Sequence, residues 1–137
     1  NKIYFGCGST HYQCKRGKGG GGIIIIYCNK FINNGIIQCN GYSQNGFYPY
    51  GYGGSGGSIL IVSKIFINNK RISSIGASSI GFNEAGCGGY GRIGIYSDNI
   101  MNIGIIKPTP YKGNFNDGYK ILKNITTKPN IYINPNT

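Results

Sequence analysis

The chain has 137 residues, enough for one domain with a sizeable hydrophobic core. Lys and Arg number 14 against three Asp and Glu, and the formal net charge of +11 predicts affinity for polyanions: nucleic acid, an anionic glycan, an anionic membrane surface or an acidic protein surface. Only 12% of the residues are charged, which excludes a disordered polyelectrolyte. The longest apolar run, residues 23–28, is too short to span a bilayer.

Residues 1–22 are expected to form an N-terminal segment, which begins with a strand at residues 3–5 and continues as a basic loop. Because the first residue is Asn1 and not Met, we expect a processed chain or a piece of a longer one. Lys18 and the four glycines that follow it, residues 19–22, are expected to form a flexible loop.

The N-terminal loop also raises the question of a metal site. Cys7, His11 and Cys14 are residue types that bind zinc, and a tetrahedral site would need a fourth ligand such as Cys28 or Cys39. Their spacing matches none of the recurrent zinc patterns, and a Cys7–Cys14 disulfide or free thiols are the alternatives, so no metal and no cofactor are predicted. Since the chain has five cysteines, at least one is expected to be free or paired between chains.

Residues 23–41 read as a unit of three short strands. The β-branched run at residues 23–27 favours a strand over a helix, and further strands are expected at residues 31–32 and 36–38. Asn and Gly between these strands suit tight turns, because both tolerate positive φ angles.

The same unit recurs twice. Strands are expected at residues 58–63, 65–67 and 71–74, and again at 92–96, 99–101 and 103–106. The equivalent positions, offset by 35 and then 34 residues, are Ile24, Ile59 and Ile93; Ile26, Ile61 and Ile95; Phe31, Phe66 and Ile100; and Asn33, Asn68 and Asn102. A fixed period of this length indicates stacked repeats, because one such unit cannot bury its own apolar face.

The three repeats, residues 23–106, are interrupted by glycine-rich and tyrosine-rich excursions at residues 42–57 and 77–91. Two prolines after Lys107 are expected to end the repeats, since proline cannot donate to a strand ladder. The rest, residues 107–137, is interpreted as a C-terminal extension. In it we expect a turn at 116–118 and strands at 119–122 and 131–133, and we expect no helix anywhere in the chain.

The predicted fold is therefore all-β: a glycine-rich parallel β-solenoid of about three rungs. The equivalent Ile and Phe residues form its inner stack, and Asn33, Asn68 and Asn102 form a hydrogen-bonded ladder at a corner. The outward positions are also apolar in the first two rungs, so the outer face is expected to be covered by the excursions, by the C-terminal segment or by a neighbouring chain. The alternative is a β-sandwich, in which the period reflects only the spacing of hairpins.

A family resemblance rests on residues 53–61, GGSGGSILI, and residues 88–96, GGYGRIGIY. This pattern resembles the glycine-rich β-solenoid segments of large cell-surface and viral fibre or adhesin proteins, over roughly residues 19–106. The resemblance implies a structural or adhesive role and brings no catalytic residues with it. The chain departs from the pattern by carrying cysteines and many tyrosines in its loops.

Enzyme activity is not expected. Hydrolysis of a glycosidic bond normally needs two carboxylates that face one bond, and the only acids are Glu84, Asp98 and Asp117, in three different segments. Asp98 is interpreted as a turn former between strands. A nucleophilic pair of His11 and a cysteine would lie on a loop with no carboxylate nearby to orient the imidazole.

Two motifs of nucleotide binding are also excluded. The glycines at residues 19–22 precede a strand and no helix follows them, so they are not a phosphate-binding loop. The segment at residues 88–95 partly resembles the aromatic strand of an RNA-recognition motif, but Arg92 replaces its central aromatic residue. The basic charge and the tyrosines of the chain remain compatible with non-specific nucleic-acid binding, in which bases stack on aromatic rings.

Two sets of residues are candidates for function. Exposed aromatic residues in rigid loops usually mark a contact with a glycan or a protein, and basic residues would add attraction for an anionic partner. The predicted binding residues are Tyr48, Tyr50, Tyr52, Tyr90, Lys15, Arg16, Lys18 and Arg92. The predicted assembly residues, on the outer face, are Ile25, Tyr27, Leu60 and Val62.

The sequence thus predicts a non-enzymatic structural or adhesive module of an extracellular, cell-surface or virion assembly. It is expected to act by self-association, or by contact with neighbouring subunits, and by binding an anionic partner such as a glycan. The alternative function is a monomeric basic module that binds polysaccharide or nucleic acid, whose affinity would fall steeply with salt.

Overall fold

The computed structural model describes residues 9–11, 14–42, 53–77 and 88–127, and this part of the chain is dominated by parallel β-sheet. The strands are β1 Ser9–His11, β2 Cys14–Lys18, β3 Ile23–Asn33, β4 Ile36–Gln38, β5 Ser58–Asn68, β6 Arg71–Ser73, β7 Arg92–Asn102, β8 Ile105–Lys107 and β9 Tyr111–Gly113. One helix, α1 Phe115–Thr127, follows them. β1 and β2 form an antiparallel pair in the segment that was predicted to be a loop.

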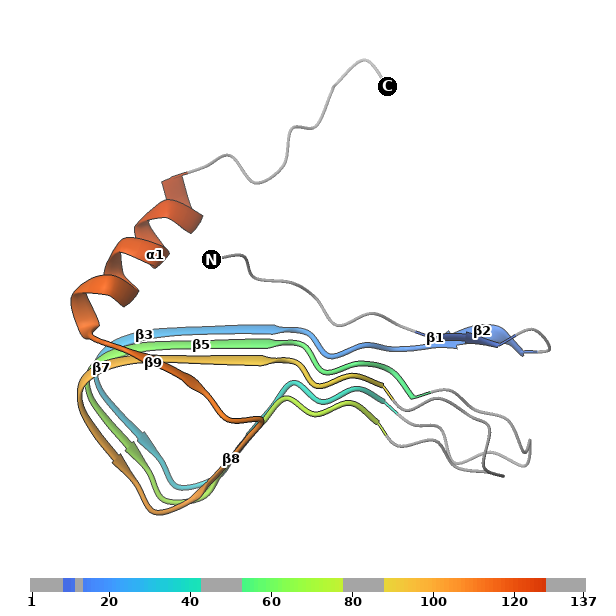
Figure 1. Ribbon diagram of the computed structural model, residues 1–137, viewed down its shortest axis with the longest axis horizontal. Helices are drawn as coiled ribbons and strands as arrows, with labels where there is room; N and C mark the ends of the chain where they lie inside the picture. Colours follow the sequence, from blue (N-terminus) through green and yellow to red (C-terminus); the bar gives the residue numbers. More distant parts are fainter. Residues whose placement is uncertain (1–8, 12–13, 43–52, 78–87, 128–137) are drawn as a thin grey trace.

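The three repeats stack in register as three successive turns of the chain (Figure 1). β3, β5, β7 and β9 form one sheet and β4, β6 and β8 form a second, both with parallel pairing. Ile24 pairs with Ile59 and Ile59 with Ile93, as predicted from the offset in sequence. The offset is therefore the register of a parallel sheet, and the alternative of hairpin spacing is wrong.

Each turn contains two strands and not the three that were predicted. The long strands β3, β5 and β7 each run for 11 residues through the position where a break was expected. Cys28 still pairs with Ser63, and Lys30 with Ile65, so the ladder continues on both sides of residue 29. The strand thus continues through the polar residues Asn29, Lys64 and Asp98. Asp98 accordingly lies inside β7 and not in the tight turn that was predicted.

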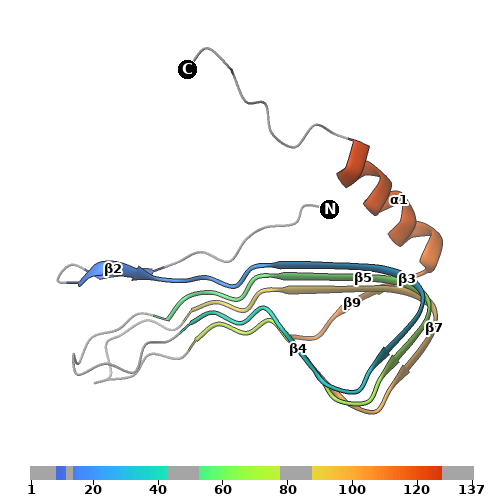
Figure 2. The ribbon, with the colours of Figure 1, turned by 180° about the vertical axis from the view of Figure 1, so that it is seen from behind.

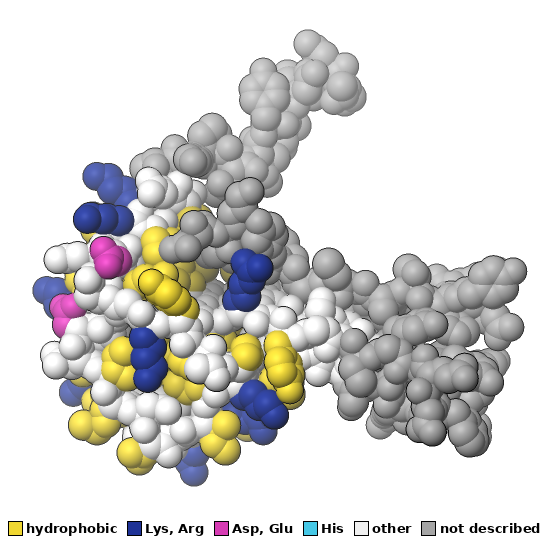
Figure 3. Space-filling view, viewed as in Figure 1, with side chains coloured by type: hydrophobic (Ala, Val, Ile, Leu, Met, Phe, Trp, Pro, Cys, Tyr) yellow, Lys and Arg dark blue, Asp and Glu magenta, His cyan; other side chains and the backbone are white. Residues whose placement is uncertain are grey.

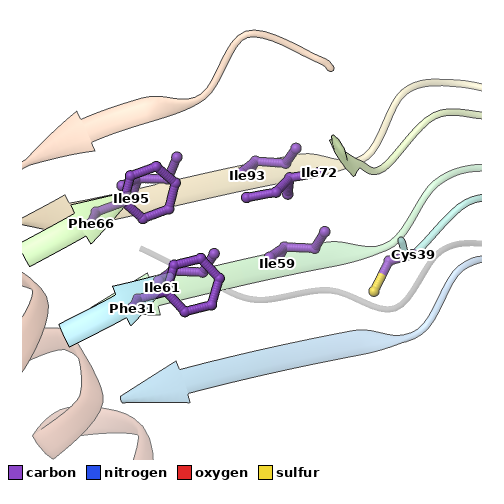
Figure 4. Close-up of a cluster of buried hydrophobic side chains, with 8 residues drawn as sticks. All are labelled: Phe31, Cys39, Ile59, Ile61, Phe66, Ile72, Ile93 and Ile95. Carbon is purple, nitrogen blue, oxygen red and sulfur yellow. The ribbon is translucent and has the colours of Figure 1, made fainter. Parts of the chain in front are cut away.

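The hydrophobic core lies between the two sheets and consists of the inward positions of successive turns. Figure 4 shows these side chains in rows, with Phe31 beside Phe66 and Ile59 beside Ile93. The two phenylalanine rings are stacked with centroids 5.3 Å apart. Burial of each such side chain contributes about 1.5–3 kcal/mol, so the second turn, whose Phe66 and Ile61 are fully buried, stabilises both neighbours.

An asparagine ladder joins the turns at the corner, as predicted. Asn33 Nδ2 donates to Asn68 Oδ1 over 2.7 Å, and Asn68 Nδ2 donates to Asn102 Oδ1 over the same distance. Asn68 is fully buried, and its amide also donates to the carbonyl oxygen of Lys70. The buried amide is thus satisfied from turn to turn, which is the condition for placing a polar side chain inside a core.

The glycine-rich segments continue both sheets as two hydrogen-bonded layers, visible from both sides in Figures 1 and 2. Bonds run between turns, as from Gly21 N to Ser55 O and from Gly56 N to Gly89 O. They also run between the layers, as from Gly57 N to Cys39 O. The expectation that the glycines after Lys18 form a flexible loop is therefore wrong for residues 19–22.

Close approach of backbones explains the glycines in these layers. A Cβ atom on Gly57 would lie 1.9 Å from the carbonyl oxygen of Gly22, and one on Gly91 would lie 2.0 Å from that of Gly57. Neither glycine has a positive φ angle, so the requirement is for space and not for an unusual backbone conformation. Hydrogen bonds in two directions leave no room for a side chain at these two positions.

The C-terminal extension packs back on the repeats. After β8, the chain crosses the end of the third turn, where Tyr111 pairs with Gly94, and then enters α1 (Figure 1). The predictions of no helix, of a turn at residues 116–118 and of a strand at 119–122 are therefore wrong. Asn114 Oδ1 accepts a hydrogen bond from Asp117 N at 2.8 Å, the pattern of a helix N-cap.

Gly118 is the residue that made α1 look like a turn. It is buried in the middle of the helix contact, and a Cβ atom there would lie 2.4 Å from the Cβ atom of Tyr96. The glycine therefore lets the helix approach the sheet closely, and the apolar side chains on either side of it supply the burial. In this position the cost of glycine in a helix is offset by packing.

Candidate functional site

α1 covers part of the outer face of the long sheet. Leu60, Val62 and Tyr96 are 6%, 0% and 5% exposed and pack against α1, which contributes Phe115, Ile121, Leu122 and Ile125. Of the three covers expected from the sequence, the C-terminal segment is the one observed here. Leu60 and Val62 are consequently not exposed, so the reason for predicting them as assembly residues no longer holds.

Ile25 and Tyr27, the other two predicted assembly residues, remain exposed at 43% and 55%. Both lie on β3, at the border of the area that α1 covers. The Tyr27 ring is stacked on Phe115, with centroids 6.1 Å apart, and lies 6.0 Å from the ring of Tyr119. We call these four residues, Ile25, Tyr27, Phe115 and Tyr119, the aromatic surface.

A cation adjoins the aromatic surface. Lys64 Nζ lies 5.9 Å from the centroid of the Phe115 ring, within the range of a cation–π interaction. Tyr119 is 47% exposed, so two phenol rings and an ammonium group face solvent together. Such a surface can stack on a sugar ring or pack against an apolar side chain, and it contains no acid or base suited to catalysis.

A second exposed aromatic residue, Tyr90, lies where the glycine layer enters β7. Its side chain is 64% exposed, and Lys107 Nζ lies 5.9 Å from its ring centroid. Arg92, two residues later, is also exposed. The structure thus adds to the predicted binding residue Tyr90 a lysine, Lys107, that the sequence had indicated only as the end of the repeats.

The remaining predicted binding residues lie either on β2 or outside the described residues. Lys15, Arg16 and Lys18 lie on β2, which is at the far end of the molecule from α1 (Figure 2). Tyr48, Tyr50 and Tyr52 lie outside the described residues. Phe115 and Tyr119 were missed because α1 was not predicted, although the apolar spacing of residues 115, 121, 122 and 125 is that of a helix face.

Two of the cysteines discussed as zinc ligands belong to the core. Cys39 is 5% exposed within the hydrophobic cluster, and Cys28 packs against it. Burial raises the pKa of both thiols, which disfavours the thiolate that would bind a metal. His11 and Cys14 pair across β1 and β2, and Cys7 lies outside the described residues. Over the ranges that the structure describes, no three His, Cys, Asp or Glu side chains form a cluster.

Asp98 and Asp117 both lie at the start of α1. Asp98 Oδ1 accepts a hydrogen bond from Phe115 N at 3.0 Å, which ties the start of α1 to β7. Burial raises the pKa of Tyr96, and the nearby Tyr111 and Asp117 add to this by disfavouring a second negative charge. Tyr96 therefore remains a neutral phenol in the contact between helix and sheet. Glu84 lies outside the described residues.

Comparisons of the chain with protein-family models, with curated proteins and with solved structures found no match. In the described part of the chain, no helix is long and apolar enough to cross a membrane.

Proposed function

We propose that the chain is a parallel β-solenoid that serves as a non-enzymatic structural or adhesive module of an extracellular, cell-surface or virion assembly. The observation that carries this proposal is the aromatic surface, in which Tyr27 and Tyr119 are about half exposed on a framework of stacked strands. Exposed aromatic residues held in fixed positions usually mark a contact surface. The module would act by contact, with its sheets supplying rigidity.

Self-association is the first part of the proposed mechanism. Apolar side chains remain exposed in all three turns, including Ile32 at 48%, Ile36 at 69%, Ile65 at 38%, Met101 at 60%, Ile103 at 77% and Ile105 at 62%. Strands with apolar residues on both faces are usually covered on both faces. Contact with further subunits would cover the part of this surface that α1 leaves open.

An anionic partner is the second part. The Lys and Arg residues whose burial the structure describes are all exposed: Lys30, Lys64, Lys70, Arg71, Arg92, Lys107, Lys112, Lys120 and Lys123. Figure 3 shows such side chains spread over one face of the molecule with apolar side chains between them. The net charge of +11 on the whole chain favours binding to an acidic glycan or to an acidic face of a neighbouring subunit.

Native mass is the test of this proposal. Self-association predicts a discrete oligomer or filament at both low and high salt, because burial of apolar surface is not screened by ions. Repeating the measurement with reductant would show whether a cysteine joins the chains. A monomer at every concentration and salt would overturn the self-associating part of the proposal.

The uniformly exposed cations also favour a second candidate function, a monomeric basic module that binds polysaccharide or nucleic acid. This function predicts a mass of 14.8 kDa and a binding constant for heparin or single-stranded DNA that falls steeply with salt. A monomer with salt-sensitive binding would favour this candidate over the assembly module.

A further inference from the structure

The third turn has an open corner. β9 pairs with residues 94–96 of β7 only, so the edge of β7 from residue 97 to 102 has no partner strand among the described residues. Ile100 occupies the inward position that Phe31 and Phe66 occupy in the other turns. Those two residues are 8% and 0% exposed, whereas Ile100 is 36% exposed. An inward position of the core is thus left uncovered.

The asparagine ladder is also incomplete at this corner. In each earlier step the Nδ2 group donates to the Oδ1 atom of the next turn. Asn102 Oδ1 accepts from Asn68, but its own Nδ2 group has no acceptor among the described residues, and Asn102 is exposed. The corner therefore offers a free strand edge, an apolar position and an amide donor in the geometry that the first two turns present to their successors.

The sequence contains a segment that fits this corner. Residues 131–134 read IYIN, and the corner of the second turn, residues 65–68, reads IFIN. Three of the four residues are identical, and the fourth exchanges one aromatic residue for another. In a fourth turn, Tyr132 would be the residue equivalent to Ile100, and Asn134 would extend the ladder beyond Asn102. No other segment of the chain outside the three turns carries this pattern.

We infer that residues 131–134 of a second copy of the chain bind this corner as a fourth, parallel strand. In the register of the earlier turns, Tyr132 would pair with Ile100 and Asn134 with Asn102. Asn102 Nδ2 would then donate to Asn134 Oδ1. Pro135 follows at the position whose N–H donates to the preceding turn, as Asn69 N does to Asn33 O, so the ladder would end there.

The length of the chain argues for a second copy over the same copy. α1 begins beside the corner, since Phe115 N lies 3.0 Å from Asp98, and its 13 residues carry the chain about 20 Å from that point. Figure 1 shows α1 directed away from the lower part of β7. The four residue steps from Thr127 to Ile131 reach about 14 Å at most. This is too short to return to the corner while α1 is in place.

This inference rests on the self-association in the proposed function and specifies its contact. The test uses two full-length variants. Tyr132→Asp combined with Asn134→Ala removes the inserted segment but keeps the corner, and Ile100→Asp blocks the corner but keeps the segment. Asn136→Ala and Asn29→Asp are the matched controls, one beyond the segment and one at an exposed position of the first turn. Thermal unfolding of each variant shows whether it folds.

Wild type and both controls are expected to be oligomeric by sedimentation, and each of the two variants is expected to be a monomer of 14.8 kDa. Mixing the two variants should produce a single 1:1 complex of twice that mass, because one supplies the free corner and the other the free segment. If Ile100→Asp does not fold, Asn102→Lys replaces it as the blocked corner.

Three results would overturn the inference, and they differ in what else they overturn. An oligomer that survives the Tyr132 and Asn134 substitutions, or a mixture without a 1:1 complex, would reject exchange of this segment and leave self-association standing. A wild-type chain that is monomeric at all concentrations would reject both.

Discussion

At the scale of single residues, the asparagine ladder shows how a polar side chain can hold a repeat in register. Asn68 is 0% exposed and forms hydrogen bonds to the turns on both sides of it. A slip by one residue against the third turn would place Met101 or Ile103 opposite Asn68 and leave its amide without that partner inside the core. Register is thus specified twice, by the apolar alternation and by the buried amides.

Asn68→Ala is expected to lower the free energy of unfolding by about 2–4 kcal/mol, because it removes hydrogen bonds on both sides and leaves Asn33 Nδ2 with a single acceptor, Arg71 O. Asn102→Ala should cost about 1 kcal/mol, since Asn102 is exposed and makes only the last step of the ladder. Urea unfolding of the two variants measures the difference. Equal losses would mean that burial of the amide is unimportant.

At the scale of elements, the glycine layers are regular structure built by backbones alone. Segments from all three turns lie side by side, and their hydrogen bonds run both along a layer and between layers. These bonds give the excursions a rigid base, because each backbone is held by two neighbours. Glycine is required where a neighbouring backbone occupies the space of a Cβ atom and is replaceable where the space is open.

A pair of adjacent substitutions tests this account. Gly57→Ala is expected to destabilise the chain by about 3 kcal/mol or more, or to prevent folding, since its Cβ atom would overlap the Gly22 carbonyl group, a backbone atom that cannot move alone. Gly22→Ala should be neutral or stabilising by up to about 1 kcal/mol, because nothing lies within 4 Å and alanine restricts the unfolded chain. Thermal melts compare the two. A similar loss at both positions would contradict close packing of the layers.

The sequence was sufficient to predict the parallel register, the inward rows and the asparagine ladder, because the equivalent residues recur at a fixed offset. It was insufficient for α1, since Gly118 favours a turn in isolation and becomes helical only against Tyr96 and Val62. Only the β3 part of the aromatic surface was predicted, because Tyr27 follows from the strand pattern. Tyr119 was not predicted, because its position depends on the helix. Tertiary packing overrode local propensity here.

At the scale of the whole molecule, positive charge is distributed and not gathered at one element. Lys120 and Lys123 are exposed on α1, while Lys70 lies in the turn between β5 and β6 and Arg71 is the first residue of β6. Only two acidic residues, Asp98 and Asp117, occur in the described segments, and both are near the start of α1. The field around the molecule is therefore positive on more than one face.

Charge reversal at these two places distinguishes a diffuse attraction from a local site. Lys120→Glu with Lys123→Glu, and Lys70→Glu with Arg71→Glu, each change the net charge by four units, from +11 to +7. If the overall field governs contact with a polyanion, both double variants should weaken heparin binding by a similar factor, roughly tenfold at low salt, and should reduce its salt dependence equally. Heparin affinity at several salt concentrations is the measurement. A loss confined to the α1 variant would instead place the anionic partner beside the aromatic surface, because those lysines share a helix with Tyr119.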